Sequence, residues 1–306
     1  MTPEAPGERG WTGLGVLALT WGSAFAFITL GVQTLPPSFV AFGRLALAAV
    51  LLTIWTLHQR RPLPPLTDRR WLWFAALGFF GNTLPFLLIA IGQREVPSGV
   101  AGILMGMTPL AIIAAAHFVL PNERLTPWKL TGFLVGFSGI VLLMGPSALE
   151  GILSTSFLMQ LLIFGATLAY ATNAILYQAG PETSPSVVAA ASLVSAAVLA
   201  APLAIYDLIF GPAITPSLPS ILAVGALGLF PTALAAIVYM GIARKVGAAF
   251  IALVNYAVPV VAALVGVLLG ESLGPTAWAA LAVILIGIFI ARRRSKPSRT
   301  APERRS

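Results

Sequence analysis

Residues 96–121 read VPSGVAGILMGMTPLAIIAAAHFVLP, an apolar stretch long enough to cross a membrane. Its middle is interrupted by Met107, Thr108 and Pro109. Proline lacks an N–H and its ring clashes with the preceding turn, so we expect Pro109 to kink or break a helix and to free carbonyl groups. In a bilayer such groups need a protein partner or a water-filled cavity. The stretch therefore predicts a site near the middle of the membrane.

The same pattern returns about 150 residues later in the chain. Val96, Ser98, Gly102 and Pro109 correspond to Val246, Ala248, Ala252 and Pro259, and Glu123, Pro127 and Gly139 correspond to Glu271, Pro275 and Gly287. Two copies of one unit are typical of many secondary transporters. We predict a first repeat at residues 9–146, a second at 150–292 and a disordered basic tail at 293–306.

The composition indicates a membrane protein. Charged residues make up 9% of the chain and apolar residues 58%, whereas soluble domains contain about 25% charged residues. The net charge of +8 is explained by basic residues at membrane borders, so we expect no nucleic-acid partner. Because the chain has no cysteine, disulfides, thiol chemistry and cysteine-based metal sites are excluded. We predict an all-α membrane protein embedded in the lipid bilayer.

Ten apolar runs reach spanning length, at about 1.5 Å per residue across about 30 Å. We place them at 13–32, 38–57, 71–92, 98–120, 128–144, 157–178, 185–206, 219–241, 248–269 and 275–291. With a cytoplasmic N-terminus, 16 of the 18 lysines and arginines fall on the cytoplasmic side, which predicts that both termini are cytoplasmic. Five helices per copy is an odd number, so we predict two inverted five-helix repeats.

Several short motifs occur in the order and spacing of a known family. They are Thr20-Trp21-Gly22-Ser23-Ala24-Phe25, Arg44 in the second span, Pro121-Asn122-Glu123-Arg124-Leu125 after the Pro109 span, and Gly270-Glu271-Ser272-Leu273 after the Pro259 span. Over residues 11–292 the chain resembles the EamA-type exporters of the drug/metabolite transporter superfamily, and most of all its bacterial exporters of aromatic and other amino acids. The resemblance implies a carrier of the bacterial inner membrane, with a cavity enclosed mainly by spans 1, 3, 4, 6, 8 and 9.

Polar and aromatic side chains share helix faces in several spans. Tyr170, Asn173 and Tyr177 lie on one face of span 6, and Phe79, Asn82, Thr83 and Phe86 have similar spacing in span 3. Amides and hydroxyls suit amino and carboxylate groups, while rings suit an apolar side chain or a cation. Ordinary helix packing through hydrogen bonds is the alternative for each residue. The other predicted substrate-binding residues are Trp21, Ser23, Met105, Thr108, Phe230, Thr232, Asn255 and Tyr256, and the predicted hinges are Pro109 and Pro259.

Two further features bear on the mechanism. Met105 and Gly106 in the first repeat correspond to Asn255 and Tyr256 in the second, so we expect adaptable contacts on one side and polar anchors on the other. Arg44 lies inside a span, where it either pairs with a substrate carboxylate or, the interpretation we favour, is a structural charge. In the structural role it snorkels outward or bonds loop carbonyls, fixing spans 1 and 2.

The acidic residues all lie in termini, loops or helix ends, which favours facilitated diffusion over proton antiport through a buried carboxylate. We expect no enzyme, cofactor or metal site, since paired carboxylates and two-histidine helical spacings are missing from the sequence. The predicted function is export of amino acids, including aromatic ones, or of related small metabolites. The alternatives are a broad drug or organic-cation exporter and a non-transporting membrane scaffold. We expect a monomer or a weak homodimer.

Overall fold

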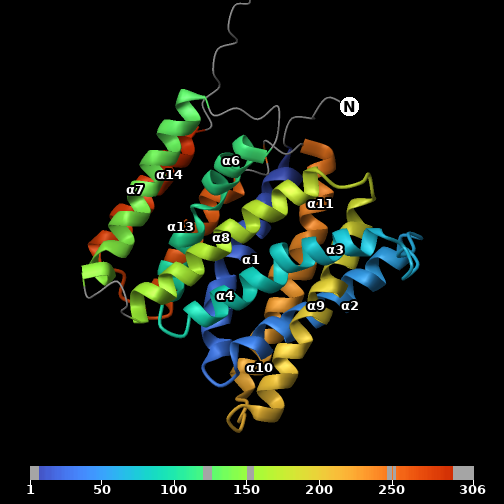
Figure 1. Cartoon of the computed structure of the whole chain (residues 1–306). Helices are drawn as coiled ribbons and strands as arrows, with labels where there is room; N and C mark the ends of the chain where they lie inside the picture. Colours follow the sequence, from blue (N-terminus) through green and yellow to red (C-terminus); the bar gives the residue numbers. More distant parts are fainter. Residues whose placement is uncertain (1–6, 120–125, 150–154, 247–249, 251–252, 292–306) are drawn as a thin grey trace, which may run out of the picture.

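The computed structural model describes residues 7–119, 126–149, 155–246, 250 and 253–291, and all regular elements in this part are helical (Figure 1). Those of the first half are α1 (Glu8–Val32), α2 (Pro37–His58), α3 (Arg70–Gly78), η1 (Phe79–Thr83), α4 (Leu84–Gly92), α5 (Ser98–Met105), α6 (Thr108–Val119) and α7 (Pro127–Leu149). Those of the second are α8 (Thr155–Gln178), α9 (Pro185–Phe210), α10 (Leu218–Leu227), η2 (Gly228–Leu234), α11 (Ala235–Val246), α13 (Val254–Leu268) and α14 (Pro275–Ala291).

Eight helical runs are long and apolar enough to cross a membrane, and α13 and α14 are two shorter apolar helices. Three of the eight runs contain more than one element: α3 to α4, α5 to α6, and α10 to α11. This confirms the prediction of an all-α membrane fold. Residues 248, 249, 251 and 252 of the predicted span 248–269 lie outside the described part, as does the predicted tail from 293 onward. The inverted arrangement of the two halves stays a prediction.

Prolines mark where several helices begin. Pro37, Pro127, Pro185 and Pro275 are the first residues of α2, α7, α9 and α14. A proline is well placed there because the first amides of a helix have no intrahelical acceptor, and its fixed φ already suits the helix. The boundaries of these helices therefore follow directly from the sequence.

The two halves of the chain are packed into each other. Helix α2 packs along α9, and α7 packs along α14. The second span of one half thus pairs with the second span of the other, and the fifth span with the fifth. Helix α1 contacts α10, α11 and α13, while α8 contacts α4, α5 and α6. Most of the helix contacts therefore join the halves, and neither half forms a separate body.

Glycines allow the closest of these contacts. A β-carbon on Gly287 of α14 would lie 2.5 Å from the backbone nitrogen of Gly136 of α7, and one on Gly132 would lie 2.5 Å from the carbonyl oxygen of Gly287. No side chain fits between backbones at that separation. The glycines at 132, 136 and 287 thus allow α7 and α14 to pack backbone to backbone.

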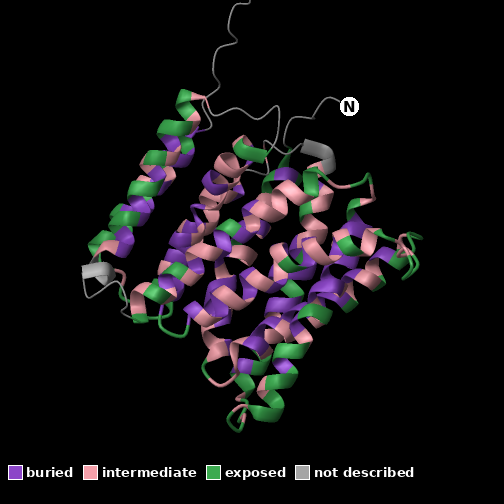
Figure 2. Ribbon diagram, in the orientation of Figure 1, coloured by how far each residue is buried: buried purple, intermediate pink, exposed green. Residues whose placement is uncertain are grey.

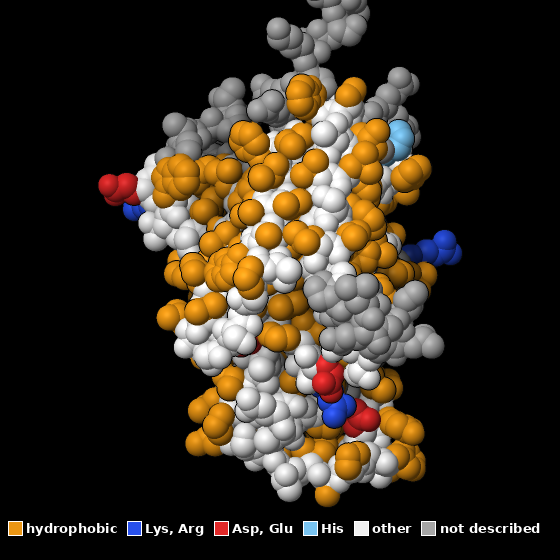
Figure 3. Space-filling model, turned by 90° about the vertical axis from the view of Figure 1, so that its left-hand side faces the viewer, with side chains coloured by type: hydrophobic (Ala, Val, Ile, Leu, Met, Phe, Trp, Pro, Cys, Tyr) orange, Lys and Arg blue, Asp and Glu red, His pale blue; other side chains and the backbone are white. Residues whose placement is uncertain are grey.

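The core and the outer surface are both apolar. Large side chains from α5, α6, α8 and α14 are fully buried against one another, among them Ile103, Leu104, Leu110, Ile163 and Ile284 (Figure 2). The face in Figure 3 is covered mainly by hydrophobic side chains, with charged ones in few places. Exposed apolar residues on the outer helices are what a protein in contact with lipid requires.

Candidate functional site

The predicted interruption of the 98–120 span is present, but it falls just before the proline. Helix α5 ends at Met105, Gly106 and Met107 form a turn, and α6 begins at Thr108. Pro109 is therefore the second residue of α6, where its missing N–H costs no helical hydrogen bond. The Thr108 hydroxyl donates to the Met105 carbonyl oxygen at 2.7 Å. The break thus has its own local hydrogen bond.

The second predicted break does not occur at Pro259. Helix α13 continues through this buried proline from Val254 to Leu268. Asn255 and Tyr256 consequently lie in the first turn of α13, and Tyr256 packs against the main core cluster. The hinge roles of Pro109 and Pro259 stay predictions.

Two π-helical segments, η1 and η2, were not expected from the sequence. Each is associated with a proline, Pro85 just after η1 and Pro231 within η2. A residue other than proline at positions 85 and 231 of an α-helix would donate from its amide to the carbonyls of Gly81 and Leu227, four residues earlier, and proline lacks that amide hydrogen. The Leu84 amide instead donates to Phe79, five residues back, and the Thr232 hydroxyl donates to the Leu227 carbonyl oxygen at 2.7 Å. Pro85 and Pro231 are the sequence signal for these wide turns, which are frequent at functional sites.

Arg44 lies at the junction of these segments. Its side chain is only 7% exposed, its Nε donates to Thr232 Oγ1 at 2.8 Å, and its guanidinium carbon lies 3.6 Å from the centre of the Phe86 ring. This corrects the expected outward snorkelling or bonding to loop carbonyls, since a charge inside a membrane protein is held more cheaply by a hydroxyl and an aromatic face in the interior. The guanidinium joins spans 2, 3 and 8 rather than spans 1 and 2.

Other predicted residues lie around this charge. Tyr170 of α8 interacts electrostatically with Arg44 and packs against both main core clusters. Trp21 of α1 donates from Nε1 to the Pro231 carbonyl oxygen at 3.0 Å, one residue before Thr232. A continuous set of contacts therefore runs from α1 through η2 to α2, α4 and α8.

The Arg44 charge has no acidic partner in the described part of the chain. The ion pair found there joins Asp68 and Arg70 in a different region. Within the same residues, neither terminal guanidinium nitrogen of Arg44 donates a hydrogen bond. The buried cation is thus held by the Thr232 hydroxyl and the Phe86 ring, and its terminal nitrogens are left as hydrogen-bond donors.

Three predicted amides are half-buried and make no side-chain hydrogen bond to other described residues: Asn82, Asn173 and Asn255. Asn173 lies directly against η1, since a β-carbon on Gly81 would come 2.6 Å from Asn173 Oδ1. Asn82 belongs to that same π-helical segment. Asn173 is therefore placed at the contact between η1 and α8, and Asn82 lies within η1 itself.

The remaining candidates do not join this set. The Ser23 hydroxyl bonds the Leu19 carbonyl of its own helix, and Thr83 Oγ1 donates to the Ala196 carbonyl oxygen of α9 at 2.9 Å. Tyr177 is exposed and lies beside Trp73. Phe79 and Phe230 expose more than a third of their surface, and Met105 packs against the main core cluster. Substrate binding by these residues stays a prediction.

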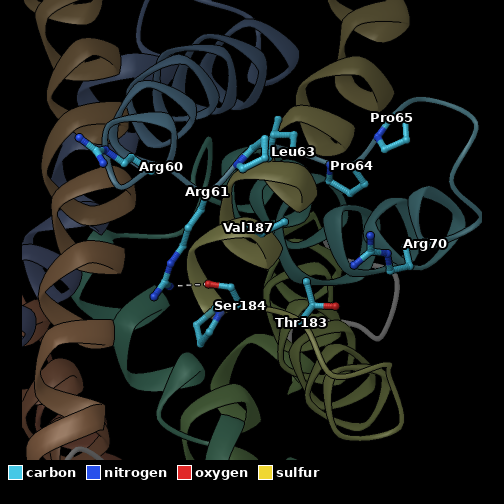
Figure 4. A pocket seen from close by; sticks show the side chains of 11 residues that line it. Arg60, Arg61, Leu63, Pro64, Pro65, Arg70, Thr183, Ser184 and Val187 are labelled. Atoms are coloured by element: carbon cyan, nitrogen blue, oxygen red, sulfur yellow. Dashed lines mark hydrogen bonds between the residues drawn. The ribbon is translucent and has the colours of Figure 1, made fainter.

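An open pocket of about 750 Å³ lies elsewhere, between the α2–α3 and α8–α9 loops (Figure 4). None of the predicted substrate-binding residues lines it. The central cavity expected from the sequence therefore stays a prediction.

The fold defines a multi-pass helical membrane protein. The chain belongs to the EamA-like transporter family, whose sequence model matches residues 10–145 and again residues 157–293. It is therefore a membrane transporter of the drug/metabolite transporter superfamily, and the family indicates transport rather than catalysis.

Relatives agree with this assignment. The chain is 31% identical over 285 residues to the uncharacterized inner membrane transporter YedA of Escherichia coli K12, with 90% of this chain and 87% of the relative covered. It is 28% identical over 291 residues to an uncharacterized transporter of Archaeoglobus fulgidus, with 91% and 98% covered. A crystal structure of a protein 23% identical to this chain matches its fold with a TM-score of 0.66, covering 92% of this chain and 96% of the other.

Proposed function

We propose that this transporter exports amino acids, including aromatic ones, or related small metabolites across a bacterial inner membrane. Buried Arg44, with no acidic partner among the described residues, carries the proposal. A buried charge is costly unless it is paired and hydrogen-bonded. The carboxylate of an amino acid would accept hydrogen bonds from the terminal guanidinium nitrogens and neutralise the charge in a bidentate arrangement.

The neighbours of Arg44 suit the rest of such a molecule. The rings of Phe86 and Tyr170 offer apolar surface to a side chain. Asn82 lies one helical turn before Phe86, and Asn173 lies one turn after Tyr170, so both amides are within a turn of the aromatic pair. Their carbonyl oxygens would accept hydrogen bonds from an ammonium group.

The contact pattern supports alternating access by inverted halves. The second spans of the two halves, α2 and α9, contact each other, and so do the fifth spans, α7 and α14. Both pairs are therefore unchanged when spans 1–5 are exchanged with spans 6–10. The contacts of α1 with α10, α11 and α13 exchange with those of α8 with α3, α4, α5 and α6. Such an exchange of equivalent contacts is what rocking of two repeats around one central site requires.

The alternatives fit Arg44 less well. An organic cation would be repelled by a buried positive charge at the same place. A membrane scaffold has no need to retain an unpaired guanidinium or half-buried amides in its interior.

The test uses proteoliposomes and two solutes that share a ring but differ by a carboxylate, phenylalanine and phenethylamine. We expect transport of the amino acid and not of the amine, and a loss of at least about tenfold in Arg44→Gln, since a charge-assisted bond is lost. Arg94→Gln is the control, because Arg94 is exposed in the loop before α5. Preferential transport of the amine would overturn the proposal in favour of a cation exporter.

Two further measurements complete the design. Cysteines introduced at positions 105, 170 and 255 should be reached by water-soluble reagents, whereas full protection together with no transport would favour the scaffold. Uptake against a gradient after an imposed pH step would contradict facilitated diffusion.

A further inference from the structure

The pocket between the α2–α3 and α8–α9 loops contains cations and hydroxyls. Arg61 extends from one wall toward Ser184, and Arg70 faces the same space from the other side, with Thr183 nearby (Figure 4). Arg61 Nη1 donates to the hydroxyls of Ser184 and, at 3.4 Å, Ser186. These bonds orient the Arg61 guanidinium without neutralising it, since hydroxyls carry no charge.

The pocket keeps a net positive charge. Arg60, Arg61 and Arg70 line it, and Asp68 pairs with Arg70 at 2.8 Å. Hydrogen bonds from Arg70 lower the pKa of Asp68, so this carboxylate is ionised at neutral pH and offsets one of the three charges. Two positive charges are left without a negative partner in this pocket.

An unsatisfied hydroxyl marks the same place. Thr183 Oγ1 is buried and has no hydrogen-bond partner among the described residues. Buried polar groups are nearly always paired, so an orphan in a positively charged pocket indicates a missing acceptor or donor. Arg61, whose charge has no acidic partner among the described residues, is the charged donor that the pocket offers to an anion, and the buried Thr183 hydroxyl lies at its lining.

The end of α2 positions Arg61 at the pocket. Arg60 has φ 57, the left-handed region that glycine usually occupies after a helix C-terminus. The amides of Arg60 and Arg61 bond back to the carbonyls of Leu57 and Thr56, closing the end of α2. A residue in this conformation commonly ends a helix, because it lets the following amides bond back to the last free carbonyls. The turn places Arg61 next to Ser184.

Two tryptophans place the pocket at the level of lipid headgroups. Trp71 donates from Nε1 to the Pro65 carbonyl oxygen at 3.0 Å, and Trp73 donates from Nε1 to the Leu176 carbonyl oxygen at 2.8 Å. A β-carbon on Gly180 would come 2.1 Å from Trp73, so the α8–α9 loop rests on that ring. Tryptophan is enriched at membrane–water interfaces, where an amphipathic ring meets the headgroups.

We propose that this pocket binds a phosphate ester, and that its source is the headgroup of an anionic phospholipid. Arg61, and Arg70 through the Nη1 that Asp68 does not use, would donate to the phosphate oxygens, and the Thr183 hydroxyl would do so once its side chain turns toward the pocket, as basic pockets between membrane helices do for anionic headgroups. Leu63, Pro64 and Val187 give the pocket an apolar wall for the glycerol and the start of the acyl chains. Its volume of about 750 Å³ exceeds the needs of a bare phosphate ion, and the pocket is open on one side, as a site for a headgroup whose acyl chains continue into the bilayer requires.

The experiment measures binding to the purified full-length chain in neutral detergent by native mass spectrometry and by thermal shift. The probes are phosphatidylglycerol, phosphatidylcholine with the same acyl chains, and soluble glycerol 3-phosphate. We expect phosphatidylglycerol to bind at least about tenfold more tightly than the other two, since both the charge and the apolar anchor contribute.

The variants Arg61→Gln and Thr183→Val should each weaken phosphatidylglycerol binding, Arg61→Gln by about tenfold or more because a charged donor is lost. Arg94→Gln, in a different loop, is the matched control and should bind like the wild type. Equal binding of glycerol 3-phosphate and phosphatidylglycerol would support the phosphate site but overturn the lipid source. Equal binding of both lipids, or variants that bind like the control, would overturn the site itself.

Discussion

Replacing Glu271 by Gln should loosen the joint between α13 and α5. In the loop after α13, Glu271 Oε1 accepts a hydrogen bond from the Ser98 amide at 2.7 Å, and Oε2 accepts one from the Gly99 amide at 2.9 Å. These are free amides at the N-terminus of α5. Gln has a similar shape, but only one side-chain oxygen, so one amide faces an NH₂ group instead of an acceptor.

The size of the effect follows from this geometry. A hydrogen bond to a charged group contributes about 1.5–3 kcal/mol, and a negative charge at a helix N-terminus adds about 0.3–1 kcal/mol. Ser98 and Gly99 are buried, so water does not replace the lost acceptor, but Glu271 itself is half-exposed. We therefore expect the free energy of unfolding to fall by about 2 kcal/mol.

The assay is reversible unfolding in mixed micelles with increasing denaturing detergent, followed by tryptophan fluorescence. Glu95→Gln is the control, because Glu95 is exposed in the loop just before α5 and makes none of these bonds. It should change stability by no more than about 0.5 kcal/mol. A Glu271→Gln protein as stable as the wild type, or no less stable than the control, would refute the reasoning.

Two further substitutions test the fold around the site. Thr232→Val removes the acceptor of Arg44 Nε and the donor to the Leu227 carbonyl, so the free energy of unfolding should fall by about 1–3 kcal/mol. Thr172→Val, which removes an exposed hydroxyl bonded within its own helix, is the control. Equal losses in the two variants would argue against a stabilising role of the Arg44–Thr232 bond. Gly287→Ala puts a β-carbon 2.5 Å from a backbone nitrogen of α7 and should cost about 1–3 kcal/mol. Gly225→Ala meets nothing within 4 Å and should be neutral or stabilising in the same unfolding assay.

The sequence predicts the spans well because their signals are local. Apolar length and prolines at helix starts both act within a single helix, and the structure reproduces nearly all of the predicted ranges. The break near Pro109 is displaced by two or three residues because a proline is better accommodated just inside a new helix than at the end of an old one. Pro259 is accommodated inside α13, with no break at that position.

The surroundings of Arg44 were not predictable from the sequence alone. Its partners, Thr232 and Phe86, are distant in sequence and belong to two other spans. A periodic pattern places a residue on a face of its own helix but does not say which neighbour that face meets. The π-helical turns were missed for a different reason: Pro85 and Pro231 signal a lost hydrogen bond, but whether the helix kinks, breaks or widens depends on which groups replace it.

The wide turns at η1 and η2 give the interior of this protein a polarity of a particular kind. Peptide carbonyls and amides neither gain nor lose protons in water at physiological pH, unlike the carboxylates with which many pumps sense protons. Their hydrogen bonds, such as that from the Thr232 hydroxyl to the Leu227 carbonyl oxygen, involve no group that titrates in this range. The polarity that the two turns give to the helices around Arg44 therefore does not change with the acidity of the medium.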